Sequence, residues 1–380
     1  MRLKLPMSEL AWRNLVHDTV RLAVTLTGIV FAVVLLVVEL GLFVGFTTTT
    51  TGLIDQSKAD IWITAARVPY VEVGVPFSER KLYTVLKTPG VEAATKLVVR
   101  FTQWKRPDGR QESVQIVGFD PDLPLGGPWN LAAGDPRDLK EADNVIVDDL
   151  YKDKLGITPG QDLFEINGRR ARVVGYTSGI RSFTTSPYVF TSFKSAQHYG
   201  GLATDQTLFI LVKVAPGADV DTVRRALAEQ LPDSDVHTTA TFSEMTRGYW
   251  MFTTGAGVAV LLAAALGLIV GVVIVAQTIY ATTMDHLREY GTLKAMGATN
   301  AYLYRVIIEQ AVASAVVGYV LAMIVSYFVV KGSQSGGAAI LVPPQMVAGM
   351  FVLTVLMCVG AALVSINKVT RLDPAMVFKG

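Results

Sequence analysis

Charged residues are scarce in this sequence, and long segments contain none at all. Of the 380 residues, 17% are Asp, Glu, Lys or Arg, whereas about 25% is typical of a soluble globular domain. No residue in 248–284, 310–330 or 332–367 is Asp, Glu, Lys, Arg or His. A helix that crosses a bilayer needs about 20 apolar residues. The sequence therefore argues against an ordinary soluble protein and predicts an α-helical integral membrane protein.

Four membrane spans are predicted from the segments with little or no charge. The first, 22–46, contains one charged residue, Glu39, and the others are 249–280, 305–330 and 346–366. A signal peptide is a different explanation for the first span, because basic residues precede it. Signal peptides have an apolar region of only about 7–15 residues and a small-residue cleavage site, and neither applies here. We interpret residues 22–46 as a retained transmembrane helix.

The distribution of Lys and Arg around the spans predicts the orientation. The amino-terminal tail has four of them, 281–305 has three, the segment after the last span has three, and 331–345 has one. Because cytoplasmic segments are enriched in Lys and Arg, both termini and the loop between the second and third spans are expected in the cytoplasm. The cytoplasmic parts are then an amphipathic helix at 1–21, a loop at 281–304 and a tail at 367–380. The outer parts are a domain at 47–248 and a short loop at 331–345.

The outer domain is expected to fold without disulfides. The only cysteine, Cys358, lies in the predicted fourth span, and about 200 residues are enough to form a packed core. Alternating strand-like runs, turn signals and short helical stretches predict an α+β domain. Its two lobes are expected at about 100–200, rich in β-structure, and at about 205–245, with a β-α-β pattern. With 23 basic and 25 acidic residues in 47–248, the domain lacks the basic excess typical of nucleic-acid binding.

Catalytic and metal-binding motifs are also missing. The sequence contains no G-x-x-x-x-G-K-[ST] phosphate loop, no H-E-x-x-H and no G-x-S-x-G, the patterns that indicate ATP hydrolysis, zinc proteases and serine hydrolases. The carboxylates of Asp148, Asp149 and Asp153 are predicted to form a solvated face rather than a metal site. We therefore expect no catalytic residue, no metal and no cofactor on this chain.

A charged, glycine-containing segment, EYGTLKAMGA at 289–298, separates the second and third spans. Together with the preceding residues it predicts a short amphipathic helix that ends at Gly297, with Met284, Leu287, Leu293 and Met296 as its apolar members. Such a helix lies at a membrane surface and can dock into a groove of a soluble protein. The alternative is a polar loop that only joins two spans.

This segment resembles the cytoplasmic loop of FtsX-like and MacB-like permeases of ABC transporters, whose pattern is R-E-x-G-x-L-[KR]-A-[LIM]-G-A. The positions that match are Arg288, Glu289, Gly291, Leu293, Lys294, Ala295, Met296, Gly297 and Ala298. The layout is similar as well, from LAWRNL before the first span to RLDPAMVFKG after the fourth. The first span and the residues that follow it are similar to the DevC-like branch, whose members resemble glycolipid exporters that work with an adaptor.

The resemblance implies a type VII ABC exporter in the plasma (inner) membrane of a bacterium. It implies two permeases, as a homodimer, with two copies of a cytoplasmic ATPase that binds ATP and Mg. A coupling helix formed by Arg288, Glu289, Gly291, Leu293, Lys294, Met296 and Gly297 would receive the ATPase stroke. The exported substrate would be hydrophobic or amphiphilic, such as a lipid, glycolipid, haem or drug. The resemblance does not decide whether a periplasmic adaptor and an outer-membrane channel take part. An alternative is an FtsX-like protein that controls a cell-wall hydrolase without transport.

Inside the predicted spans, one acidic residue and two glycine pairs are candidate functional positions. A charge deep in a span costs about 2.5–3.5 kcal/mol. Glu39 is therefore predicted either to face substrate or a dimer partner, or to reach the outer interface. The pairs Gly41 with Gly45 and Gly267 with Gly271 have the spacing that allows close approach of helices, including across a dimer.

Overall fold

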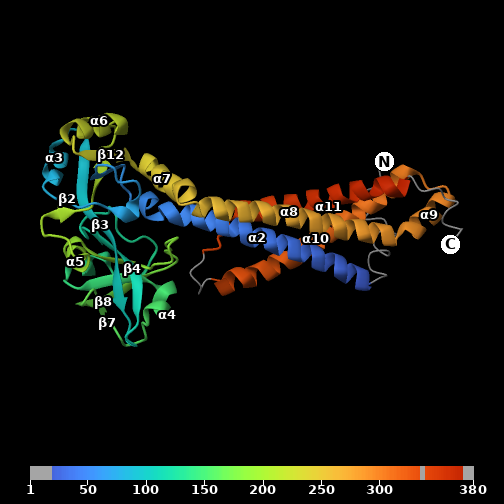
Figure 1. Ribbon diagram of the computed structural model, residues 1–380, viewed down its shortest axis with the longest axis horizontal. Helices are drawn as coiled ribbons and strands as arrows, with labels where there is room; N and C mark the ends of the chain where they lie inside the picture. The colour runs from blue at the N-terminus through green and yellow to red at the C-terminus, as the bar shows by residue number, and fades with distance from the viewer. Residues whose placement is uncertain (1–18, 334–338, 371–380) are drawn as a thin grey trace. The chain divides into compact units, whose positions relative to one another are not determined.

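The computed structural model describes residues 19–333 and 339–370, and the chain divides into two compact units (Figure 1). The membrane unit comprises residues 1–44, 259–333 and 340–380, and the outer unit comprises residues 45–258 and 334–339. Most of the amphipathic helix predicted at 1–21 and of the cytoplasmic tail predicted at 367–380 lies outside the described residues.

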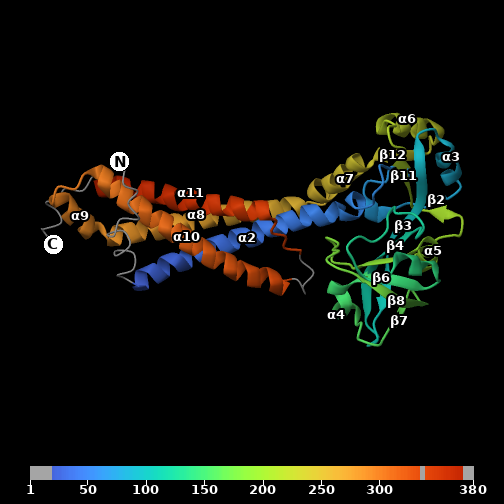
Figure 2. The same ribbon diagram turned by 180° about the vertical axis from the view of Figure 1, so that it is seen from behind.

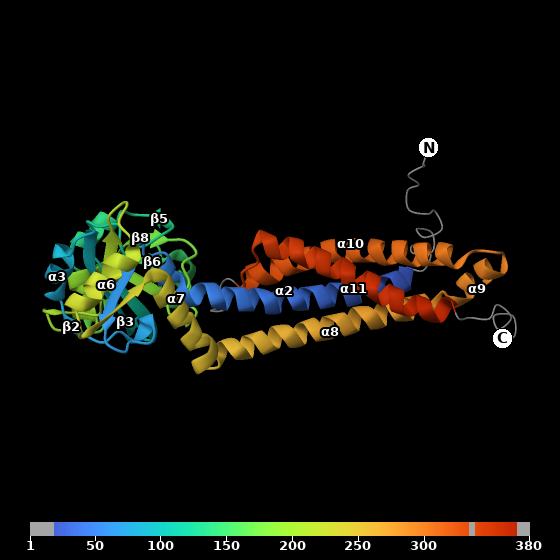
Figure 3. The same cartoon turned by 90° about the horizontal axis from the view of Figure 1, so that it is seen from above.

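Four long helices dominate the membrane unit. They are α2 (Thr19–Asp55), α8 (Ala256–Asp285), α10 (Asn300–Ser333) and α11 (Pro344–Thr370). Each is long and apolar enough to cross a membrane. They run lengthwise beside one another, with the short α9 (Leu287–Ala295) between α8 and α10 at one end (Figure 3). The predicted fold class, four spanning helices with an α+β domain between the first and the second, is confirmed.

The first helix continues nine residues beyond the predicted boundary at residue 46 and ends at Asp55. The threonines that follow the apolar run remain helical, and the hydroxyls of Thr49 and Thr50 bond to carbonyls one turn earlier. Thr49 Oγ1 donates to Gly45 O at 2.7 Å, and Thr50 Oγ1 donates to Phe46 O at 2.6 Å. Such bonds satisfy the hydroxyls within the helix itself. The threonine run at 47–51 is therefore part of α2.

The outer unit is built on one large sheet. Its strand order is β12-β1-β11-β3-β4-β9-β6-β8-β5, with β7 paired to β3 and β8, and a separate small sheet pairs β10 with β2. The strands are β1 (Ile61–Ala65), β2 (Phe77–Ser78), β3 (Val91–Lys105), β4 (Gln111–Phe119), β5 (Leu131–Ala133), β6 (Asn144–Asp148), β7 (Leu163–Ile166), β8 (Arg169–Thr177), β9 (Tyr188–Ser192), β10 (Gln206–Thr207), β11 (Phe209–Val214) and β12 (Ser234–Thr238). The long β3 pairs with β11 through its first half and with β4 through its second half.

Short helices complete the outer unit. They are η1 (Val71–Val73), α3 (Lys81–Lys87), η2 (Pro136–Lys140), η3 (Asp149–Tyr151), α4 (Lys152–Leu155), α5 (Phe193–Tyr199), α6 (Val220–Gln230), α7 (Thr239–Gly248) and the π-helix η4 (Tyr249–Thr253). Figure 2 shows α3 and α6 at the β12 end of the sheet and α4 at the other end.

Side chains along β1 and β11 alternate between two hydrophobic cores, one on each face of the sheet. Trp62 and Leu211 belong to the larger core, which also contains most of the strands from β3 to β9. Ile63 and Val212 point to the other face, where the helices α3 and α6 cover them. Successive side chains of a strand lie on opposite faces of its sheet. The predicted β-α-β pattern at about 205–245 is present as β11, α6 and β12, with β1 inserted between the two strands.

Asp148 differs from its prediction as part of a solvated face, because its side chain is buried and only 1% exposed. Its carboxylate accepts hydrogen bonds from the Thr177 hydroxyl at 2.8 Å and from the backbone N–H groups of Leu150, Gly179 and Ile180. Burial nevertheless raises the pKa of this carboxyl above its ordinary value. The prediction was wrong because a carboxylate that accepts several hydrogen bonds can be buried without a cation.

Candidate coupling site

The charged segment between the second and third spans contains the helix α9. The helix ends in a Schellman motif: Gly297 N–H donates to Lys294 O at 3.1 Å and Ala298 N–H donates to Leu293 O at 3.0 Å. This ending requires a left-handed residue, and Gly297 has φ of +93°, which glycine adopts without steric cost. The sequence thus fixes where the helix stops.

One side of α9 is attached to the membrane unit through Tyr290. The Tyr290 side chain is 1% exposed, and its hydroxyl donates to Gln310 Oε1 of α10 at 2.9 Å. Leu293, one turn later, packs partly buried against the same core, and Gly291 is buried. On the preceding turn, His286 Nδ1 lies 3.1 Å from Glu289 Oε2. The helix is therefore held by an aromatic residue and a hydrogen bond, rather than by aliphatic residues alone.

The other side of α9 faces outward. The side chain of Met296 is 72% exposed and that of Glu289 is 50% exposed, while Lys294 is half-buried. Met296, predicted as an apolar member of the amphipathic helix, lies on this exposed side. The side chains of Leu287 and Arg288 lie outside the described part of the chain.

A small cavity of about 30 Å³ lies beside the Tyr290–Gln310 hydrogen bond, which is room for a single water molecule. Thr25 of α2 and Thr282 of α8 line it, and their hydroxyls are 2.8 Å apart. Gln310 Nε2 is buried and has no hydrogen-bond partner among the described residues. We call Tyr290, Gln310, Thr25 and Thr282 the polar joint, since these residues bring α9 together with three spanning helices.

Glu39 and the two predicted glycine pairs are found in contacts within the chain. A Cβ added to Gly267 would lie 3.1 Å from Glu39 Cγ, and one added to Gly271 would lie 3.2 Å from Leu36 Cδ1. This pair lets α8 approach α2, and Glu39 is half-buried beside it.

The first glycine pair approaches the extended segment that precedes α11. Gly41 O accepts a hydrogen bond from Leu341 N–H at 3.0 Å, and Gly45 leaves room for the carbonyl of Ala339. Across residues 19–333 and 339–370, no three His, Cys, Asp or Glu side chains come together as metal ligands.

Two family models match this chain. Residues 22–230 match the MacB-like periplasmic core domain, and residues 261–374 match the FtsX-like permease C-terminal region. The chain belongs to the family of MacB-like and FtsX-like permeases. The resemblance predicted from the segment 288–298 is confirmed, and that segment lies inside the FtsX-like region.

Relatives of this permease are found in mycobacteria. An uncharacterized ABC transporter permease of Mycobacterium tuberculosis H37Rv is 24% identical over 364 residues, which are 94% of this chain and 95% of the relative. A second uncharacterized ABC transporter permease of the same organism is 24% identical over 386 residues, 98% of each chain.

Solved structures of outer domains are similar to part of the permease. The periplasmic region of MacB from Actinobacillus actinomycetemcomitans is 13% identical, with 50% of this chain and 92% of that chain covered and a TM-score of 0.39. The extracellular domain of the ABC-type transporter YknZ from Gram-positive bacteria is 12% identical, with 47% and 98% covered and a TM-score of 0.34.

Proposed function

We propose that this permease is a subunit of an ATP-driven ABC exporter and that α9 receives the movement of a separate cytoplasmic ATPase. The family supports the transporter role, because the relatives carry the name ABC transporter permease. One observation supports the role of α9 most directly. Its inner side is fixed to α10 by the Tyr290 hydroxyl, while Glu289 and Met296 are exposed on its outer side. A short helix that is attached on one side and exposed on the other can transmit a displacement to the spanning helices.

The movement would then reach two spanning helices. Residue His286 alone separates α9 from α8, so a displacement of α9 acts on α8 through the chain itself. The Tyr290–Gln310 hydrogen bond transmits the same displacement to α10. In sequence, α8 follows directly from α7 and η4 of the outer unit. A stroke in the cytoplasm would therefore move the outer domain, which is the mechanotransmission that we propose for export.

The assembly we propose has two copies of the permease and two ATPase subunits, with both termini in the cytoplasm. ATP and Mg would be bound by the ATPase, because the sequence has no phosphate loop. The exported substrate would be hydrophobic or amphiphilic, and an adaptor and outer-membrane channel would extend the path in a bacterium with two membranes. Glu39 is proposed to contact substrate or the partner permease, since it is the one charged residue of its span.

A charge-reversal variant tests the coupling role. Glu289→Lys changes the exposed side of α9 and leaves the Tyr290 contact intact, so the permease should insert and copurify with the ATPase but lose export. Gly297→Pro should have the same effect, because proline cannot adopt φ of +93°. The matched control is Glu92→Lys, a charge reversal at an exposed position of the outer unit. Normal export by both α9 variants would refute the proposal.

Reconstituted vesicles with the cognate ATPase separate export from signalling. ATP hydrolysis that is stimulated by a cargo lipid, and lipid movement that depends on ATP, support export. Activation of a cell-wall hydrolase without lipid movement would support the FtsX-like alternative instead.

A further inference from the structure

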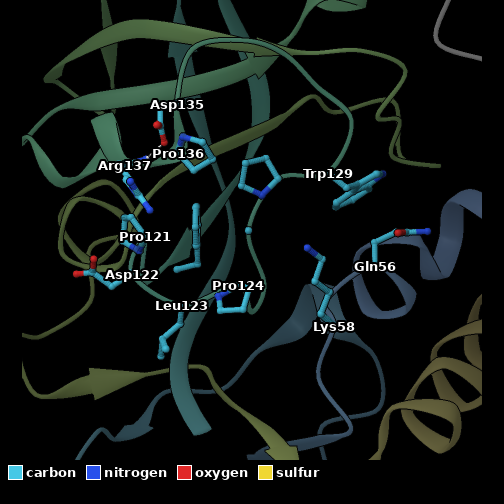
Figure 4. Close-up of a pocket in the computed structure, with 13 residues that line it drawn as sticks. Gln56, Lys58, Pro121, Asp122, Leu123, Pro124, Trp129, Asp135, Pro136 and Arg137 are labelled. Atoms are coloured by element: carbon cyan, nitrogen blue, oxygen red, sulfur yellow. Dashed lines mark hydrogen bonds between the residues drawn. The ribbon is translucent and has the colours of Figure 1, made fainter.

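A pocket of about 360 Å³ lies in the outer unit, next to the end of α2. Three separate segments form its walls: residues 56–58 after α2, residues 119–129 from the end of β4 through the loop toward β5, and residues 135–137 at the start of η2. Figure 4 shows Lys58 and Trp129 on one side of the opening and Arg137 on the opposite side. Binding sites for small molecules usually have volumes of about 300–1,000 Å³. The pocket is therefore large enough for a small ligand or a headgroup.

The loop wall of this pocket is rigid. Pro121, Pro124 and Pro128 restrict its backbone, because the proline ring fixes φ near −65°. Gly126 N–H donates to Ser57 O at 2.9 Å and ties the loop to the end of α2. A Cβ on Gly126 would lie 2.7 Å from Leu97 Cδ1, so the close approach needs glycine. A wall fixed in this way is preorganised, which lowers the entropic cost of binding.

The charges that line the pocket favour an anion. Both acidic residues are already engaged: Asp122 forms an ion pair with Lys140, and Asp135 accepts the Arg137 backbone N–H at 2.8 Å as a helix cap. By contrast, neither the Lys58 ammonium nor the Arg137 guanidinium has a hydrogen-bond or ion-pair partner within the described residues. Lys58 is held in the left-handed region at φ of 59°, a conformation that is costly for residues other than glycine and is concentrated at functional sites.

Trp129 supplies a flat apolar surface at the same opening. Its ring is half-buried and is supported from behind by Tyr188 and Phe190, whose ring centroids lie 6.4 and 5.9 Å away. Tryptophan buries large apolar area with little loss of conformational freedom, so it is suited to hold a ring against its face. The exposed Gln56 amide beside it has both donor and acceptor atoms for hydroxyl groups.

We propose that this pocket binds a small anionic ligand, in which a phosphate or carboxylate is attached to a ring or sugar. The anion would lie between Lys58 and Arg137, and the ring would lie on Trp129. A soluble sugar phosphate and the headgroup of an anionic glycolipid both have this chemistry. The proposal is independent of the coupling role of α9, because binding requires neither the ATPase nor nucleotide.

Calorimetric titration of the full-length permease with inositol 1-phosphate tests this site, with uncharged myo-inositol as the comparison. Saturable binding of the phosphate is expected, and Lys58→Gln or Arg137→Gln should each weaken it about tenfold through loss of a charge-assisted hydrogen bond. The control Lys87→Gln removes the same charge from an exposed position on α3 and should leave affinity unchanged. Thermal unfolding of each variant checks that it is folded.

Nanodiscs that contain phosphatidylinositol or only phosphatidylcholine distinguish the two sources of ligand. Tighter association of a lipid-depleted permease with phosphatidylinositol, lost in Lys58→Gln, supports a lipid headgroup as the ligand. Binding of inositol 1-phosphate without a lipid preference supports a soluble ligand. Absence of saturable binding of both probes, or equal binding by wild type and by both pocket variants, would overturn the proposal.

Discussion

The buried carboxyl of Glu72 is predicted to make the stability of the outer unit depend on pH. Glu72 lies in η1, where its Oε2 accepts a hydrogen bond from Trp250 Nε1 of η4 at 3.4 Å. Its Oε1 is buried without a partner among the described residues. Aromatic rings surround it: Tyr70 stacks on Tyr249 at 4.1 Å, and Phe183 contacts Trp250 at 4.4 Å.

Two tyrosines, Tyr70 and Tyr188, interact electrostatically with this carboxyl. Burial raises the pKa of Glu72 from 4.5 to about 7, although hydrogen bonds from its own backbone and from Trp250 act in the opposite direction. Between pH 4.5 and about 7, this carboxyl therefore keeps a proton in the folded state that it has lost in the unfolded state. The associated stability is fully present below pH 4.5 and is lost as the pH rises to about 7.

The size of the effect follows from the shift. A rise in pKa from 4.5 to about 7 corresponds to roughly 3 kcal/mol, at 1.36 kcal/mol per unit. For a domain of this size, 1 kcal/mol changes Tm by about 2–4 °C, so the full effect is roughly 6–12 °C. Glu72→Gln is neutral at every pH and should escape this loss.

Thermal unfolding followed by tryptophan fluorescence measures this difference. The Tm of Glu72→Gln should exceed that of the wild type by roughly 6–12 °C at pH 8, and the difference should shrink steadily toward pH 5. Glu92→Gln, at an exposed position of the same unit, should match the wild type throughout. A difference that does not change between pH 5 and pH 8 would refute the reasoning.

Three further predictions concern the membrane unit. Tyr290→Phe and Gln310→Leu each remove the Tyr290–Gln310 hydrogen bond, so export per ATP hydrolysed should fall several-fold. The double variant should be no worse than either single variant. Independent, additive losses would contradict a shared contact. Gly271→Leu should reduce the yield of folded permease, because the added side chain meets Leu36 of α2, whereas Gly349→Leu, with open space around it, should not. Glu39→Ala should leave assembly with the ATPase intact but reduce export, and wild-type export rates would contradict a substrate or partner role.

The spanning helices could be predicted from the sequence because absence of charge is a strong and local signal. Their ends could not be predicted as well, since the threonines after residue 46 are polar and yet continue the helix to Asp55. In the charged segment, Gly297 was recognisable as a helix end from residue type alone. Tyr290 was not recognised as the buried anchor, because its importance depends on Gln310, twenty residues further along the chain.

The two outer features depend on contacts between distant parts of the chain. Lys58 and Arg137 become neighbours of one pocket only because the loop 119–129 folds against the end of α2. Glu72 contacts Trp250 of η4, which lies 178 residues further along the chain. Single-sequence patterns carry no information on such pairings, so neither site was predicted.

Photo-crosslinking from Met296 tests the central claim most directly. Its side chain is 72% exposed on the outer side of α9, so benzoylphenylalanine at this position should crosslink to the ATPase in the assembled complex. The same group at Tyr83 of α3, which is 66% exposed in the outer unit, should give no ATPase crosslink. If the complex assembles and position 296 does not crosslink to the ATPase, α9 is not the site that receives the stroke.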